Sequence, residues 1–280
     1  MSEGRYEFKY IVSREMREAL LAFIAPFVVP DGSAGPLTGM LPGFVGPGGQ
    51  TPRGYAVHSL YLDSARLHGY GERLAEQRIR NRIRIRTYGE AGTSAPVFLE
   101  AKRKLAIEVI KHRVRVGPVH AWEQLTGPTP WIAAVARCPE PSRRMAERWL
   151  APVLAEDMRA VVGIHYVRET YVDGETRLTL DHYLKATACP RPNLISAPGE
   201  ELLIPEDQIV LELKFKGAAP LWVRQTVARF RLCAEPVSKF ALGVARTLRA
   251  EHPAELRYLT PPSLLRTGRA LPPPARGAAR

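Results

Sequence analysis

Several segments of this chain alternate ionic and apolar residues with a period of two. The densest is residues 82–86, which read Arg-Ile-Arg-Ile-Arg. Successive side chains of a β-strand point to opposite faces, so the three arginines would share one face and the two isoleucines the other. Residues 97–102 repeat the alternation after a loop-like stretch that contains glycine, and the two segments together predict a β-hairpin.

The same alternation recurs in four more segments, which indicates a shared role for the charged positions. A single strand of this kind needs no ligand, because its apolar face packs inward and its charges meet water. Solvated strand faces, however, mix small polar residues with both charge signs, whereas Arg and Lys dominate here. Six such strands favour one shared charged cavity over unrelated solvated faces. The further segments are residues 6–10, 111–115, 177–181 and 211–216.

Helices and turns are predicted around these strands. Ser13 suits an N-cap, and the apolar residues that follow it keep helical spacing up to position 27. Asp173-Gly174 marks a tight hairpin turn. Tyr61 is interpreted as a packing residue. The remaining pattern predicts strands at residues 55–63 and 209–215, helical or irregular segments at 64–74, 131–150, 222–232 and 242–250, and a Gly- and Pro-rich loop at 30–52.

The composition fits one large globular domain. The chain has 280 residues, 45% of them hydrophobic, which supports a real core. We expect residues 1–260 to form that domain and residues 261–280, a Pro- and Arg-rich tail without acids, to be disordered. The three cysteines are too few and too widely spaced for a disulfide framework or a zinc motif. Neither a signal core nor a run of about 18 apolar residues occurs, so we expect a soluble, cytoplasmic protein without a transmembrane segment.

The net charge of +12 indicates an anionic partner. Charge alone does not choose among nucleic acid, membrane and phosphate. The sequence carries no helix-turn-helix, zinc-finger or RNP-like signal, and its cations alternate in phase with carboxylates rather than with exposed aromatic platforms. Nucleic acid is therefore the less favoured partner.

Eight short motifs resemble one known family when they are taken in order. They are Arg5-Tyr-Glu7-Phe-Lys9-Tyr10, Ser59-Leu-Tyr61-Leu-Asp63, Arg82-Ile-Arg84-Ile-Arg86-Thr-Tyr88-Gly89, Leu99-Glu100-Ala-Lys102, Tyr166-Val-Arg168, Arg177-Leu-Thr-Leu-Asp181, Leu211-Glu212-Leu-Lys214-Phe215 and Ser238-Lys239-Phe240. In this order they resemble VTC-type polyphosphate polymerase domains, part of the triphosphate tunnel metalloenzyme superfamily, over about residues 5–245. The superfamily's opening signature has two glutamates before its lysine, whereas Arg5 stands at the first of those positions here, as in the VTC branch.

The resemblance implies a mainly β fold with flanking helices (α+β), in which about eight antiparallel strands close into a barrel that forms a triphosphate tunnel. A closed barrel of that size has no sheet edges and can hold one slender ligand. Charge repulsion supports a ligand too, because two like charges about 4 Å apart repel by up to about 4 kcal/mol at an effective dielectric of 20. A lumen lined by cations would oppose folding unless an anion such as polyphosphate filled it.

The resemblance also implies an activity and residue roles. The expected enzyme is a polyphosphate polymerase, a metal-dependent phosphotransferase that moves the terminal phosphate of ATP onto a polyphosphate chain. Its divalent ion, Mn²⁺ or Mg²⁺, prefers oxygen ligands; Glu212 is the first candidate, and Glu7 and Glu100 are second candidates that could equally be struts for neighbouring cations. The expected catalytic positions are Arg84, Arg86, Lys102, Lys111, Arg168, Arg177 and Lys239, with Lys9, Arg82, Arg113 and Lys214 as further phosphate-binding positions.

Other functions remain open on the same sequence. A hydrolase of tripolyphosphate or of a nucleoside triphosphate would use the same tunnel with water as the acceptor. A catalytically silent polyphosphate binder and a nucleic-acid binder are the alternatives without catalysis.

Overall fold

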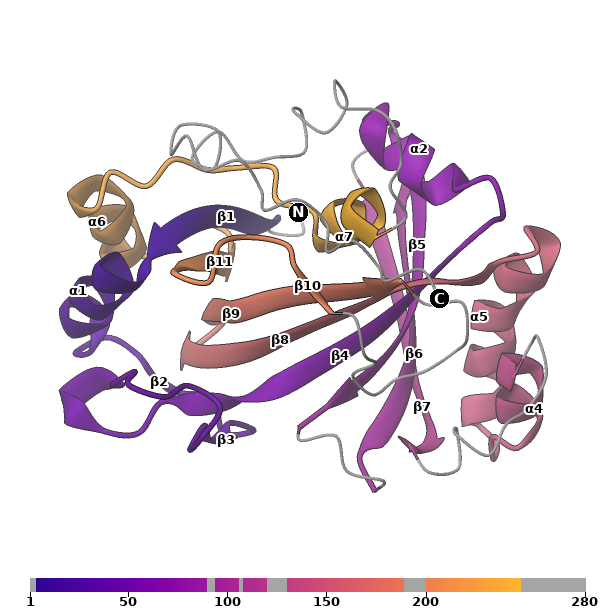
Figure 1. Ribbon diagram of the computed structural model, residues 1–280, viewed down its shortest axis with the longest axis horizontal. Coiled ribbons are helices and arrows are strands. Elements are labelled where there is room, and N and C mark those ends of the chain that lie inside the picture. The colour runs from indigo at the N-terminus through magenta and orange to yellow at the C-terminus, as the bar shows by residue number, and fades with distance from the viewer. Residues whose placement is uncertain (1–3, 90–93, 106–107, 120–129, 189–199, 248–280) are drawn as a thin grey trace, which may run out of the picture.

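One antiparallel sheet of eight long strands carries the charged segments. The computed structural model describes residues 4–89, 94–105, 108–119, 130–188 and 200–247. The strands, in their order across the sheet, are β1 (Arg5–Ser13), β11 (Gln208–Lys216), β9 (Thr176–Ala188), β8 (Arg159–Asp173), β4 (Arg53–Asp63), β5 (Ile79–Tyr88), β6 (Pro96–Leu105) and β7 (Glu108–Pro118) (Figure 1). The predicted tail at residues 261–280 lies outside the described residues.

Short elements complete the described part of the chain. Three two-residue strands lengthen the sheet locally: β2 (Val29–Pro30) pairs with β8, β3 (Gly35–Pro36) with β4, and β10 (Glu201–Leu202) with β9. The helices are α1 (Arg14–Ile24), α2 (His68–Leu74), α4 (Pro130–Ala136), α5 (Ser142–Ala155), α6 (Leu221–Arg229) and α7 (Lys239–Thr247), with a 3₁₀ turn η1 (Pro47–Gly49).

The predicted closed barrel is wrong, because the sheet is open. Strands β1 and β7 are its two ends, and neither pairs with the other within the described residues. Both edge strands carry cations on the charged face, Lys9 on β1 and Lys111 on β7, and like charges brought opposite each other by pairing are destabilising. Charged side chains on an edge strand also disfavour pairing with another chain, so these edges do not need closure for protection. The mainly β fold with flanking helices is confirmed.

Local signals placed several elements correctly. The Ser13 hydroxyl accepts a hydrogen bond from the Met16 amide and so caps α1, as the sequence predicts. Strands β8 and β9 form the predicted hairpin, and Gly174 at its turn adopts a positive φ of 53°, which glycine accommodates without a Cβ clash.

The helices pack at different parts of the sheet. Helices α1 and α6 contact each other at one end, α5 contacts β6 and β7 at the other, and α7 lies on β8 and β9 (Figure 1). Ile83 and Ile85, the apolar half of the arginine strand, are buried with Trp131 and Trp149 of α4 and α5. The hydrophobic segment at 131–150 therefore packs, as predicted. No helix in the described ranges has both the length and the apolar character needed to cross a bilayer.

A buried ionic group ties α1 to the opposite face of the sheet. Arg17 and Glu169 have fully buried side chains and form a two-pronged pair, with Nε and Nη2 2.8 and 2.5 Å from the carboxylate oxygens. Nε2 of His182 lies 2.8 Å from the same carboxylate. Burial raises the pKa of Glu169, but the hydrogen bonds from His182 and Arg17 outweigh burial and lower the pKa overall. The ionic groups on this face of the sheet are therefore paired with one another. The opposite face, which carries Arg82, Arg84 and Arg86, is the one with charges available to a ligand.

Candidate functional site

Strand register sorts the charged side chains of β5, β6 and β7 into cross-strand rows. Arg84 pairs with Glu100, which pairs with Arg113. One step along, Arg82 pairs with Lys102, which pairs with Lys111. The first row has a carboxylate at its centre, whereas the second consists of three cations. The two rows are two residues apart on each strand, so both lie on the same face of the sheet.

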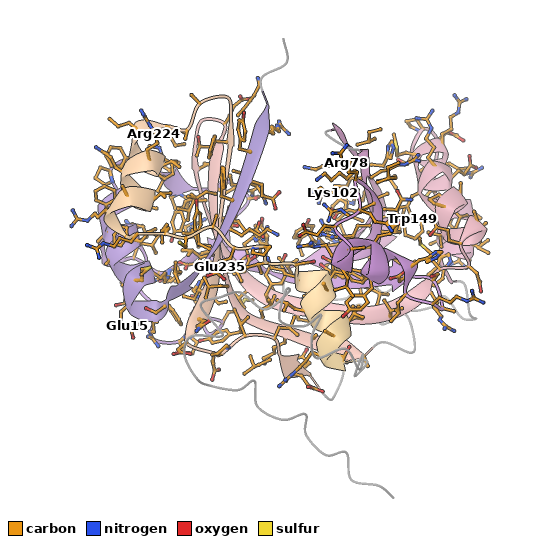
Figure 2. All side chains as sticks on the ribbon, turned by 90° about the horizontal axis from the view of Figure 1, so that it is seen from above. Glu15, Arg78, Lys102, Trp149, Arg224 and Glu235 are labelled. Carbon is orange, nitrogen blue, oxygen red and sulfur yellow. The ribbon has the colours of Figure 1, made fainter. Side chains whose placement is uncertain are left out.

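This face borders a cavity of about 410 Å³ between β5–β7 on one side and β1, β11 and β8 on the other. In Figure 2, Lys102 lies on the side of its wall that faces β1. Ten lysine or arginine side chains and three glutamates line the cavity: Lys9, Arg82, Arg84, Arg86, Lys102, Lys111, Arg113, Arg168, Lys214 and Lys239, with Glu7, Glu100 and Glu212. Thirteen of the fourteen residues singled out by sequence are thus brought together.

Glu100 organises the wall formed by β5–β7. Its carboxylate accepts a 2.6 Å hydrogen bond from Nε of Arg84 and lies 3.3 Å from Nε of Arg113 and 3.9 Å from Nη1 of Arg86. Burial raises the pKa of Glu100, but the charges of Arg84 and Arg86 outweigh this effect and bring the pKa below its usual value. The carboxyl therefore stays ionised. Nε1 of Trp149 donates to the Glu100 carbonyl oxygen from behind the strand. The guanidinium groups of Arg84, Arg86 and Arg113 are therefore held in place without a ligand.

Two buried carboxylates organise the opposite wall. Asp181 accepts hydrogen bonds of 2.6 and 2.8 Å from Arg168 and lies 2.6 Å from Nζ of Lys239, the first residue of α7. Glu212 lies 2.9 Å from Lys239 and 2.8 Å from Lys214. Burial acts against both charges, but Lys239 and the neighbouring cations hold the pKa of Glu212 well below its usual range. Asp181 raises the pKa of Lys239 against the effect of its burial.

Three cavity cations have no carboxylate oxygen within 4 Å in the described part of the chain: Arg82, Lys102 and Lys111, the members of the second row. Lys102 is exposed as a whole residue, but partial desolvation of its ammonium group lowers its pKa to about 8; Lys111 adds to this effect while Glu7 opposes it. A second cavity of about 740 Å³ shares Lys102, Arg82 and Glu7 with the first and continues past Arg80. Two members of the unbalanced row, Arg82 and Lys102, therefore lie where the two cavities meet.

Sequence reasoning missed several residues of the site. Tyr61 lines the cavity rather than only packing, and its hydroxyl accepts a 3.2 Å hydrogen bond from Nη1 of Arg84. Burial raises the pKa of Tyr61, but Arg84, Arg86 and Arg82 together bring it down to about 7. Tyr61 pairs with Arg84 in the strand register, which the alternation of residues 55–63 could have suggested. Asp181 likewise ends the motif Arg177-Leu-Thr-Leu-Asp181, but the sequence pattern predicts no role for it.

Arg177 is the one predicted residue that does not line this cavity. Its Nη2 lies 2.6 Å from Oδ2 of Asp31 and 3.3 Å from the Tyr55 hydroxyl, and its Nε donates to Thr170. It shares the charged face of β9 with Asp181 but stands four residues away along the strand. The alternation predicted its face correctly, and its position along the strand is what separates it from the cavity.

Comparison with known proteins identifies the family. A model of the VTC domain matches residues 4–248. The chain belongs to the VTC domain family. The resemblance on which the sequence interpretation relied is therefore confirmed. A search of curated proteins finds no match to this VTC domain.

Solved structures similar to this VTC domain share little sequence with it. A proposed adenylyl cyclase from Hippeastrum, described as having a dominant triphosphatase activity, is 17% identical, with a TM-score of 0.49 over 89% of this chain and 100% of that one. A proposed adenylate cyclase from Bacillus halodurans is 14% identical, with a TM-score of 0.44 over 85% and 95% of the two chains. One from Vibrio parahaemolyticus is 11% identical, with a TM-score of 0.41 over 86% and 98%.

The carboxylates of this VTC domain could hold a divalent ion only if phosphate oxygens or water completed its ligands. Among the described residues no group of three or more His, Cys, Asp or Glu side chains could hold an ion. Mg²⁺, however, is commonly bound by one or two carboxylates together with phosphate oxygens and water. Glu7 and Glu212 are two carboxylates close to each other on one wall, because both lie within 4 Å of Nζ of Lys9, and they are the pair that could hold such an ion. Glu100 lies on the opposite wall, among arginines.

Proposed function

We propose that this VTC domain binds a triphosphate or polyphosphate in its cationic cavity and transfers a phosphoryl group from ATP to a polyphosphate chain. The imbalance of charge carries the proposal: ten cationic side chains and three glutamates surround about 410 Å³. Phosphate suits this lining, because guanidinium groups bind phosphate oxygens in a two-pronged geometry and ammonium groups supply compact charge. A nucleic-acid partner is less well supported, since these cations face one another across a cavity.

Phosphoryl transfer needs little covalent chemistry from the protein. The protein mainly has to position the phosphates and stabilise the negative charge on them. Arg84 and Arg86, held by Glu100, would contact the phosphates from one wall. Arg168 and Lys239, held by Asp181, would contact them from the other. Cations that are fixed before the ligand arrives stabilise developing charge without reorganising.

The row of Arg82, Lys102 and Lys111 would bind one phosphate group, because its three positive charges have no carboxylate partner among the described residues. A divalent ion, Mn²⁺ or Mg²⁺, would supply further positive charge on phosphate oxygens when bound. Glu212 and Glu7 are the residues that would hold it, whereas Glu100 is better suited to fixing arginines.

Hydrolysis of the same substrates is the second candidate, and access for water favours it. The Glu7 side chain is 34% exposed at the cavity wall, and Lys102 is exposed there too. Water could therefore reach a bound phosphate and act as the acceptor in place of a polyphosphate chain.

A single assay separates the two candidates. Purified protein would be incubated with ATP and Mn²⁺ or Mg²⁺, and both long-chain polyphosphate and free phosphate would be measured. Polyphosphate is the result that we expect, and free phosphate alone would identify a hydrolase. Arg84→Gln should lose either activity, whereas Arg144→Gln, a matched change at a position 85% exposed on α5, should retain it. Absence of both products, or activity indifferent to Arg84→Gln, would refute the proposal.

A further inference from the structure

Three aromatic side chains meet at the end of the charged face opposite to Arg80. They are Tyr55 of β4, Tyr88 at the end of β5 and Phe98 of β6, and we call them the aromatic rim. The Tyr55 and Tyr88 ring centroids are 5.5 Å apart, and those of Tyr88 and Phe98 are 5.7 Å apart, with the rings nearly perpendicular in both pairs. All three side chains are only partly buried. The rim is thus an aromatic surface that a ligand can reach.

The rim continues directly from the cations of the cavity. The Tyr88 hydroxyl lies 3.5 Å from both Nη1 of Arg86 and Oε1 of Glu100. The Arg113 guanidinium lies 4.0 Å from the Phe98 ring centroid and 5.2 Å from that of Tyr88, and half of its side chain is exposed. A ligand with phosphates among the arginines therefore has aromatic rings and a stacked guanidinium plane within reach of its next group.

The two ends of the charged face differ in chemistry. Beyond Arg82, the second cavity continues past Arg73, Arg80 and Lys104, where lysine and arginine prevail. The other end carries the aromatic rim. The span from Tyr88 to Arg82 is six residues of one strand, or about 20 Å at about 3.3 Å per residue, which an extended nucleoside triphosphate could occupy.

We propose that the aromatic rim binds the nucleobase of a nucleoside triphosphate, so that the donor lies with its base at Tyr88 and Phe98 and its terminal phosphate near Arg82 and Lys102. This proposal rests on the proposed function and adds the orientation in which the nucleotide lies along the cavity. Bases stack on aromatic rings and on guanidinium planes with little regard to sequence, so the rim accepts more than one nucleotide. The polyphosphate chain then occupies the end that contains Arg80 and Lys104.

Binding measurements test the rim without any need for turnover. Titration calorimetry would compare ATP with tripolyphosphate, which shares the phosphates and lacks the base. Phe98→Leu should weaken ATP binding by about tenfold or more, the effect of losing a base–aromatic stack, and should leave tripolyphosphate binding within about twofold. Phe27→Leu, at an exposed ring beyond the C-terminal end of α1, is the control and should leave both affinities unchanged.

A comparison on the wild-type protein guards against a variant that fails to fold. ATP should bind about tenfold more tightly than ribose 5-triphosphate, which has the same charge without the base. Equal affinities in that comparison would overturn the rim, as would a Phe98→Leu variant that loses both ligands equally or neither. Wild-type protein that binds neither ATP nor tripolyphosphate would overturn the proposed function itself, and the rim with it.

Discussion

Replacing Glu212 with glutamine should destabilise the free protein and strengthen its response to anions. The Glu212 carboxylate is 6% exposed and lies 2.8 Å from Lys214, 2.9 Å from Lys239, 3.5 Å from Arg168 and 3.7 Å from Lys9. Glutamine keeps the size of the side chain and one oxygen that accepts hydrogen bonds, but it removes the charge. Four cations then face a cavity that already has too few carboxylates.

The magnitude follows from what remains after the substitution. Removing one partner of a buried ion pair costs about 3–5 kcal/mol. Asp181 still balances Arg168 and Lys239, and Glu7 still lies 3.5 Å from Lys9. We therefore expect a loss of about 2–3 kcal/mol in the free energy of unfolding, below the full range for an unrelieved charge.

A polyanion should restore much of this loss. A ligand that binds only the folded state stabilises it by about 2.7 kcal/mol at one hundred times its dissociation constant. Because the variant cavity carries one more positive charge, tripolyphosphate should bind it more tightly than it binds the wild type in the absence of metal. Urea denaturation with and without tripolyphosphate measures both effects. Glu18→Gln, an exposed glutamate 3.7 Å from Arg14 on α1, is the matched control and should change stability by less than about 0.5 kcal/mol.

Acid provides a second measurement on the same variant. Lys239 and the other neighbouring cations hold the pKa of Glu212 below its usual value of 4.5, although burial opposes them. A carboxyl with a depressed folded-state pKa adds stability above its unfolded pKa and loses it as pH falls through the folded pKa. Stability of the wild type should therefore fall more steeply below pH 4.5 than that of Glu212→Gln. A variant as stable as the wild type, or one that tripolyphosphate stabilises no more than the wild type, would refute this account of the cavity.

Two further predictions address the cavity cations. Arg84→Ala combined with Arg86→Ala should lower transfer by at least about 100-fold, because each fixed cation stabilises the charge that develops on the transferred phosphate, whereas removal of residues 262–280 should leave the rate unchanged. An active double variant would place the essential charge elsewhere. Tripolyphosphate affinity should fall by about tenfold between pH 6.5 and 9, because Tyr61 gains a negative charge near pH 7 and Lys102 loses its positive charge near pH 8. Calorimetry across that range checks this, and a variant with Tyr61→Phe and Lys102→Arg should lose less affinity over the range than the wild type does. An equal change in both proteins would contradict the assignment.

The faces of the strands could be predicted from sequence because they depend on a local rule. Side chains alternate along any strand, so Arg82, Arg84 and Arg86 must share one face whatever the rest of the chain does. Their apolar neighbours, Ile83 and Ile85, are buried as the pattern requires. The hairpin between β8 and β9 follows from an equally local turn signal.

Closure of the sheet could not be predicted in the same way, because it depends on the first and last strands of the sheet. The alternation in β1 and β7 is the same whether or not those strands meet. Whether they pair depends on the charges that pairing would bring together, Lys9 on one edge and Lys111 on the other among them. That information lies in positions about a hundred residues apart in sequence.

Position along a strand, rather than face, separates the residues that build the site from those that do not. Arg177 and Asp181 share one face of β9, yet Asp31 balances Arg177 outside the cavity, while Asp181 balances two cations from different elements within it. A cation that already has a carboxylate gains less from a phosphate than one that has none. The row of Arg82, Lys102 and Lys111 has no carboxylate oxygen within 4 Å among the described residues, so it is where we expect a bound phosphate to lower the free energy most.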